Sequence, residues 1–367
     1  MKKILAVYTG GTICTCTEND IRVLNLKQAR RTIVNNYING SSRYAADISD
    51  DFFVEAELDF STLSENLTIS KLNKIIDSIK QNINREDIMG VIVLHGTDTL
   101  AYSSAILSLM FQNAPKPIML VSANRPANED GTNANDNFCT AVELIIDGIA
   151  PNIYVPYRNS DGKMWLHLAA TLMQCPNFSE NFRNANTKNA FLVEENGIAI
   201  LLRLCSELSE KRLVKNARTE LEQDINAVIG DKAFLLKDEV LYIEPYLGLN
   251  YERISLNGIK AIIHGTYHSG TVCVGRDREN EKYDNYSILH LCDRCNAKNI
   301  PIFISPSSLD EGQYSSVYDA VKSGKVAVLN MTKEMAFAKA LLGASCGIKT
   351  ECFISYMKTI SINNEFI

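Results

Sequence analysis

The sequence predicts an α/β fold in two domains, a larger N-terminal domain built on a parallel sheet and a smaller C-terminal α/β domain. Short apolar runs alternate with segments whose apolar residues recur at helical spacing, which is typical of α/β proteins. A charged and less regular stretch interrupts this alternation in the middle of the chain. The length of 367 residues is enough for two domains of ordinary size.

The first half of the chain supplies the elements of the N-terminal domain, which we assign to residues 1–182. The strand candidates are the apolar runs at residues 3–8, 90–94, 117–121 and 152–156. Apolar side chains at helical spacing predict helices over residues 69–79 and 100–111. Strands that alternate with helices form a parallel sheet with right-handed crossovers.

The middle of the chain, residues 183–237, is more charged and contains the exposed helical pattern ELSEKRLVKNARTELEQD. It is either an extended linker between the domains or a helical insertion. From residue 238 the alternation resumes, and residues 238–367 form the predicted C-terminal domain. Its strand candidates are VLYIEP, IKAIIHG, IPIFISP and KVAVLN, and its helix candidates lie near residues 288–299 and 333–342.

Composition excludes several classes of protein. The net charge of −6, with no long basic run, does not indicate a nucleic-acid partner. No apolar run approaches the roughly 20 residues of a membrane helix, and the apolar start is too short for a signal peptide. The ten cysteines are scattered, and Cys292 and Cys295 lack the second pair that zinc would need, so no metal site is predicted. We therefore expect reduced thiols and a cytoplasmic protein.

The stretch AVYTGGTICT, residues 6–15, places two glycines and a threonine directly after an apolar strand. Gly10 and Gly11 permit backbone angles closed to other residues and let another molecule approach the main chain. The hydroxyl of Thr12 would point into the crevice where open α/β sheets bind ligands. The alternative is a plain turn from strand to helix.

A second strand end carries a matching signal in VIVLHGTDT, residues 91–99. Gly96, Thr97 and Asp98 follow this strand, so two strands of one parallel sheet bring threonines to the same edge. A threonine hydroxyl attacks only when a neighbour takes its proton. The carboxylate of Asp98 can serve in proton transfer or bind the ammonium group of a ligand.

TGGTI together with HGTDT resembles the bacterial-type L-asparaginase family. The segments ILSLMFQNAPKPIMLVSANRP and LNMTKEMAFAKALLG extend the resemblance over most of the chain. The resemblance implies hydrolysis of the side-chain amide of asparagine, or of a related amide, through a threonine acyl-enzyme without metal or cofactor. It also implies a homodimer or homotetramer. Relatives include the archaeal subunit that deamidates amino acids for tRNA-dependent amidation.

The resemblance assigns roles to individual residues. Thr12 matches the nucleophile, Thr97 the threonine that relays a proton or itself attacks, and Asp98 the aspartate that grips the substrate's α-amino group. In LSENLT, Ser64 would contact the substrate's α-carboxylate and Glu65 would lie at its amino end. A glutamate there is more similar to the amidotransferase relatives than to ordinary asparaginases.

Four further residues complete the predicted site. Ser122 and Ala123 match the segment whose backbone carbonyl holds the amide nitrogen, and the amides of Gly11 and Gly96 would form an oxyanion hole. The alternative for Ser64 is a helix N-cap, because serine is preferred there. The histidines near the two sets of strand ends are expected to be structural: His95, His264 and His268. The alternative for His264 and His268 is that they line the site of a neighbouring subunit.

Two residues of the family pattern are missing. The family lysine that contacts the second threonine has no counterpart in HLAATLMQCPNFSENF, residues 167–182. Lys163 is a possible substitute, although a lysine on a surface turn is the alternative. The flexible loop after Thr12, CTCTENDIRVLN, also lacks the family tyrosine. A catalytically silent protein that binds a small ligand as a sensor or regulatory subunit is therefore the competing interpretation.

Overall fold

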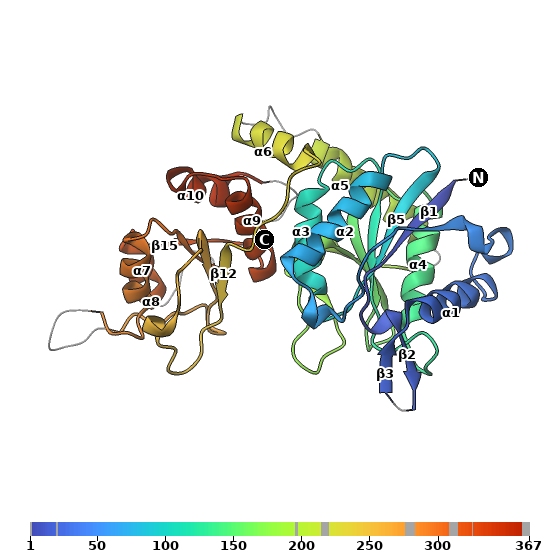
Figure 1. Ribbon diagram of the computed structural model, residues 1–367, viewed down its shortest axis with the longest axis horizontal. Helices are drawn as coiled ribbons and strands as arrows, with labels where there is room; N and C mark the ends of the chain where they lie inside the picture. Colours follow the sequence, from blue (N-terminus) through green and yellow to red (C-terminus); the bar gives the residue numbers. More distant parts are fainter. Residues whose placement is uncertain are drawn as a thin grey trace. The chain divides into compact units, whose positions relative to one another are not determined.

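The chain divides into two compact units, Met1–Phe234 and Leu235–Ile367. The computed structural model describes residues 2–19, 21–194, 197–213, 220–275, 283–307, 315–324 and 326–361. Each unit has its own sheet with helices packed on it, which confirms the predicted α/β fold (Figure 1). Within these ranges, no helix has the length and apolar character needed to cross a membrane.

In its described residues, the first unit is built on a seven-stranded sheet with the order β11-β8-β7-β6-β5-β1-β4. The five strands from β4 to β7 are parallel, whereas β8 and β11 run antiparallel. The predicted parallel sheet is thus confirmed, with an antiparallel extension on one side. The strands are β1 (Lys3–Tyr8), β4 (Phe53–Glu55), β5 (Ile88–Leu94), β6 (Ile118–Val121), β7 (Ile153–Arg158), β8 (Met164–Leu168) and β11 (Ala190–Leu192).

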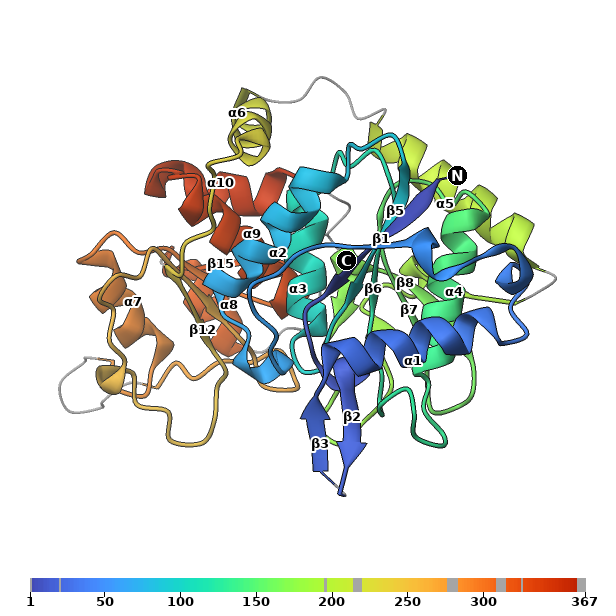
Figure 2. The same ribbon diagram turned by 45° about the vertical axis from the view of Figure 1, so that its right-hand side comes forward.

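Helices cover both faces of this sheet. The helices α1 (Leu26–Ile38) and α4 (Ala134–Ile146) share one buried cluster with residues of β1 such as Ile4 and Ala6. The helices α2 (Ile69–Asn82) and α3 (Leu100–Met110) lie on the opposite face (Figure 2). The apolar residues that predicted α2, including Leu72, Ile75 and Ile76, are buried.

Residues up to 234 belong to the first unit. The strand β11 pairs with β8, and β10 (Arg183–Asn184) pairs with β9 (Leu172–Met173). The helix α5 (Ile198–Leu213) buries Leu201 and Cys205 in the core. The helix α6 (Glu220–Gly230) is attached through the Lys80 ammonium, which donates to the Ile229 carbonyl at 2.8 Å. Of the predicted helical stretch, residues 214–219 lie outside the described residues.

The second unit contains, in the part that the structure describes, a four-stranded parallel sheet with the order β12-β13-β14-β15. Cys292 and Cys295 lie on the buried face of the helix α7 (Ile288–Asn296) and belong to the core of this unit. The strands are β12 (Val240–Ile243), β13 (Ala261–His264), β14 (Ile302–Ile304) and β15 (Val326–Val328), and the helices are α7 (Ile288–Asn296), α8 (Ser315–Lys322), α9 (Lys333–Ser345) and α10 (Thr350–Thr359).

Thr68 caps α2, because its side chain accepts a hydrogen bond from the Lys71 amide at 3.3 Å. We expect Thr68→Ala to lower the free energy of unfolding of the first unit by about 1 kcal/mol, since the first turn loses an acceptor. Thr68→Ser keeps the hydroxyl and is the matched control. Fluorescence of Trp165, the one tryptophan of the chain, follows this unit during urea unfolding. Equal midpoints for the two variants would contradict the assignment of the cap.

His264 is fully buried in the second unit, where its Nδ1–H donates to the Gly265 carbonyl and its Nε2 accepts from the Tyr251 hydroxyl at 2.7 Å. Burial lowers the pKa of His264 to about 4, against about 6.5 in an unfolded chain. The unfolded state therefore binds more protons between these values, so stability is lost as the pH falls from 6.5 to 4.

We expect protection of the β13 amides in hydrogen exchange to fall over this pH range. His264→Gln should lose stability at pH 7 and show a weaker dependence on pH. An unchanged pH dependence in that variant would assign the effect to other groups.

Candidate active site

The strands β1 and β5 are parallel neighbours that end at the same edge of the first sheet, with Tyr8 in register with Leu94. The prediction that the two threonine motifs follow strands of one parallel sheet and lie at the same edge is confirmed, and the two strands are also adjacent. Thr12 and Thr97 are half-buried on the loops after these strands, and Asp98 is exposed. Thr12 begins a short 3-10 turn, Thr12–Cys14, and its carbonyl accepts from the Thr15 hydroxyl at 2.7 Å.

The glycines after β1 bring the loop at residues 9–12 against the chain at Thr62. Gly10 and Gly11 have φ values of 127° and 72°, which favour glycine. The Gly11 amide donates to the Thr62 carbonyl at 3.0 Å, and a Cβ on Gly10 would lie 1.9 Å from the same oxygen. The Gly11 amide, predicted as an oxyanion donor, is thus engaged with the protein's own backbone.

Gly96 connects this loop with the next one. A Cβ on Gly11 would lie 2.2 Å from the Gly96 Cα, and a Cβ on Gly96 would lie 2.4 Å from the Ser64 Oγ. Three separate segments therefore meet at distances that leave no room for a side chain at Gly10, Gly11 or Gly96: the loops after β1 and β5 and the segment at residues 62–64. The glycines are required by this packing of protein on protein.

Ser64 is buried and its hydroxyl is bound to Asp98. It donates to Oδ2 of Asp98 at 3.0 Å and accepts from the Asp98 amide at 3.2 Å. The Thr99 hydroxyl donates to the Ser64 carbonyl at 3.1 Å. The cap of α2 is Thr68, so the N-cap alternative for Ser64 is wrong, and its hydroxyl holds the carboxylate of Asp98 instead.

Gln174 holds the loop that carries Thr97. Its Nε2 donates to the Thr97 carbonyl at 2.8 Å, and its Oε1 accepts from the Ala101 amide in the first turn of α3 at 3.4 Å. Gln174 comes from the segment in which the predicted lysine is missing, and sequence reasoning did not find it. A neutral amide can orient a backbone carbonyl, but it supplies no positive charge.

A cavity of about 450 Å³ lies beside Thr97 and Asp98. Two carboxylates, of Asp98 and Glu180, line it, and the described lining residues include no lysine, arginine or histidine. Burial, and the nearby Glu180, raise the pKa of Cys175 to about 12, so this thiol is neutral at pH 7. The other lining residues are Asn124, Tyr157, Gln174, Pro176, Asn177, Phe178, Ser179 and Phe182.

The remaining predicted site residues occupy varied environments. Glu65 is exposed, with no hydrogen bond or ion pair to any described residue. Ser122 and Ala123 are fully buried after β6, and the Ser122 carbonyl accepts from Asn137 Nδ2 at 2.9 Å. Lys163 is exposed in the turn between β7 and β8.

His95 lies at the end of β5 and is buried. Its Nδ1–H donates to the Gly96 carbonyl at 2.7 Å, and its Nε2 accepts from the Ser103 hydroxyl at 2.9 Å. Burial lowers the pKa of His95, so the ring stays neutral and keeps both bonds. The structural role expected for this histidine agrees with these contacts.

The segment after Thr12, expected to be a loop, forms a hairpin. The strands β2 (Thr15–Glu18) and β3 (Ile21–Leu24) pair antiparallel (Figure 1). The Thr17 hydroxyl and the Arg22 guanidinium both bind the Glu129 carboxylate, the latter at 3.0 Å. The hairpin was missed because its strands have only four residues each and because CTCTENDI contains no glycine at the turn and no run of large apolar residues.

Gly96→Ala should lower the free energy of unfolding of the first unit by about 1–3 kcal/mol, because the new methyl group overlaps Ser64 Oγ. Gly230→Ala is the control, since a Cβ there meets no atom within 4 Å. Urea unfolding followed by Trp165 fluorescence measures both. If both variants unfold at the same urea concentration, the close approach at Gly96 is wrong.

A comparison with known proteins places these features in a family. The model of the asparaginase N-terminal domain matches residues 3–200, more than half of the chain. The D-type subunit of glutamyl-tRNA(Gln) amidotransferase from Metallosphaera sedula is 30% identical over 156 residues, covering 41% of this chain and 34% of the relative. Its counterpart from Methanosphaera stadtmanae is 24% identical over 329 residues, covering 86% of this chain and 68% of the relative. The match with the first of these thus spans about a third of its length.

Solved structures show the same fold. The thermostable L-asparaginase from Thermococcus kodakarensis is similar with a TM-score of 0.69 and 20% identity, covering 100% of this chain and 99% of the other. L-asparaginase I from Vibrio cholerae has a TM-score of 0.66 and 19% identity, with the same coverage. With its family model, its fold and its two threonine motifs in agreement, the chain belongs to the asparaginase family.

Proposed function

We propose that this protein hydrolyses the side-chain amide of L-asparagine, or of a related amide, to the acid and ammonia through a threonine acyl-enzyme. Membership of the asparaginase family supports an amidohydrolase of this type. The observation that carries the proposal is the hydrogen bond of Ser64 to Asp98 beside Thr97, on a loop packed against that of Thr12. A carboxylate, a serine and two threonines are thereby held at one sheet edge.

Substrate binding would use the charges at this edge. The Asp98 carboxylate would pair with the substrate's ammonium group, and Glu65 would strengthen the negative field at that end. The Ser64 hydroxyl has one proton, which it donates to Asp98 in the free protein, so on substrate binding it would turn to donate to the substrate's α-carboxylate. The Ser122 carbonyl already accepts one hydrogen bond and has a second lone pair for the amide nitrogen, with Ala123 beside it.

In the chemical step, Oγ1 of Thr12 attacks the amide carbonyl and its proton passes to the leaving nitrogen by way of Thr97. A C–O bond forms, the C–N bond breaks, and ammonia leaves an ester on Thr12. Water then attacks this ester, releases the acid and returns a proton to Thr12. The Gly96 amide would stabilise the oxyanion, whereas the Gly11 amide is bound to Thr62 and Gly11 sets the approach of the loops.

A catalytically silent protein that binds a small ligand is the second candidate. It is favoured by the absence of lysine and arginine from residues 167–182, where Gln174 contacts the Thr97 loop. Losing one acid–base partner costs roughly 10²–10⁴-fold in rate. The proposed enzyme is therefore slow. By its resemblance to the asparaginase family, we also propose that it is cytoplasmic, uses no metal or cofactor, and forms a homodimer or homotetramer.

The test is ammonia release from L-asparagine and L-glutamine at millimolar concentration. We expect Thr12→Ala to reduce kcat by about 10³-fold or more and Thr97→Ala to reduce it by roughly 10²–10⁴-fold. Thr12→Ser keeps a nucleophilic hydroxyl and should retain part of the activity. Thr187→Ala, an exposed threonine remote in sequence from both motifs, is the matched control.

Activity that survives in Thr12→Ala would overturn the threonine mechanism. Thermal stabilisation by asparagine without ammonia release, in the wild type and in Thr12→Ala alike, would favour the silent protein. If the protein neither releases ammonia nor is stabilised by asparagine or glutamine, these two amino acids are excluded as its ligands.

A further inference from the structure

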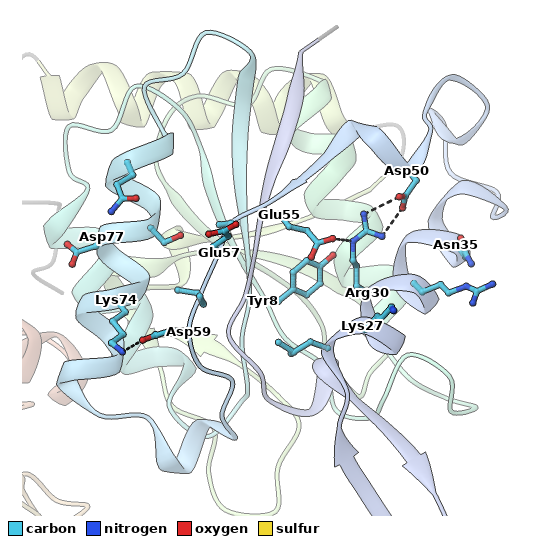
Figure 3. Close-up of a pocket in the computed structure, with 16 residues that line it drawn as sticks. Tyr8, Lys27, Arg30, Asn35, Asp50, Glu55, Glu57, Asp59, Lys74 and Asp77 are labelled. Atoms are coloured by element: carbon cyan, nitrogen blue, oxygen red, sulfur yellow. Dashed lines mark hydrogen bonds and ion pairs between the residues drawn. The ribbon is translucent and has the colours of Figure 1, made fainter.

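A second and larger cavity, about 1250 Å³, lies along the outer edge of the first sheet (Figure 3). It is a groove beside β4, walled by α1 on one side and by α2 on the other. None of its lining residues belongs to the candidate active site. Its volume exceeds the roughly 300–1,000 Å³ of small-molecule pockets, so the groove is large enough for a peptide.

The floor of the groove is the edge of a sheet. The strand β4 is last in the strand order and pairs with β1 on one side. The Ala56 amide donates to the Ala6 carbonyl at 2.9 Å, so the backbone groups of Glu55, which alternate with those of Ala56, point to the outer edge. An edge of this kind is a template for one more strand.

The two walls differ in their available charge. Arg30 is paired with Asp50, at 3.0 Å, and with Glu55. Lys27 and Arg31 on α1 are exposed and have no ion pair with any residue that the structure describes. One wall therefore presents two cations that are available to a ligand.

Acidic groups mark the opposite side of the groove. Glu57 is exposed and has no ion pair within the described ranges, and Asp77 lies on α2 (Figure 3). Lys74 is on the same wall but is paired with Asp59 at 2.5 Å. The groove is therefore positive along α1 and negative toward α2.

Tyr8 supplies an independent sign of a missing partner. Its side chain lines the groove beside Arg30 and Glu55 (Figure 3) and is 6% exposed. Its hydroxyl has no hydrogen-bond partner among the described residues. A buried hydroxyl is normally satisfied, so the unused donor and acceptor of Tyr8 mark an unfilled polar position at the groove floor.

We propose that this groove binds an extended peptide segment as an added strand on β4. Successive side chains of a strand point to opposite faces. A segment that alternates acidic and basic residues would therefore place its carboxylates toward Lys27 and Arg31 and its cations toward Glu57 and Asp77. Main-chain hydrogen bonds would give affinity and the two walls would give specificity.

Two labelled peptides of equal composition test this proposal on the full chain, acetyl-EKEKEKEK-amide and acetyl-EEKKEEKK-amide. The first separates the charges onto two faces, whereas the second mixes them on each face. We expect the first to bind roughly tenfold tighter in fluorescence anisotropy, and more weakly as salt is added. Proline in place of a central residue should abolish binding, since it removes a backbone donor. Equal affinity for the two peptides would overturn the proposal.

The double variant Lys27→Glu with Arg31→Glu should lose the preference for the alternating peptide. Lys188→Glu with Lys232→Glu makes the same charge change at exposed positions outside the groove and should keep it. Analytical ultracentrifugation of the chain without peptide measures whether the groove is instead covered by a second copy of the chain. A dimer that the first double variant dissociates, without peptide binding by the wild type, would assign the groove to a second copy and overturn the peptide proposal.

Discussion

The site depends on two close contacts, of the Gly11 backbone with the Gly96 backbone and of the Gly96 backbone with the Ser64 side chain. The distances leave no volume for a side chain, so the two glycines fix how closely the ends of β1 and β5 approach the segment that carries Ser64. The hydrogen bond from Ser64 to Asp98 exists because of this approach. The glycines of the two motifs thus act first through packing, and the chemistry of the threonines is built on that packing.

The fold could largely be predicted because its strands are short, apolar and buried, and because helices separate them. β1, β5, β6 and the four strands of the second unit were all found within a few residues of their bounds. The helices α1 and α4, the inner strand β8 and the edge strands β4 and β11 were missed. β4 has three residues, of which Glu55 is exposed, and β11 has three, of which Leu192 is exposed, so neither shows a continuous apolar run. Their place in the sheet is decided by pairing with distant segments.

The candidate site was predictable to a lesser degree. Motif position placed Thr12 and Thr97 at the same edge of one parallel sheet, and the local sequence around Ser64 indicated its loop. Gln174 could not be found, because its role consists of contacts with Thr97 and Ala101, more than seventy residues away in the chain. The sequence carries one indirect indication of its role, because the segment that contains Gln174 lacks the lysine of the family pattern. The groove along β4 could not be predicted either, because its walls come from two helices that are separated in the sequence.

The hairpin β2–β3 has a consequence for the dynamics of the edge that carries Thr12. Its base is packed in the core through Cys16, whereas Ile21 and Val23 near its tip are 65% and 42% exposed. The tip is held mainly by polar contacts with Glu129, which cost little free energy to break. Such a segment opens by local unfolding while the sheet stays intact. The part of the hairpin around Ile21 and Val23 can therefore open and close at a rate that is independent of the global stability of the domain, while the residues next to Thr12 stay packed in the core.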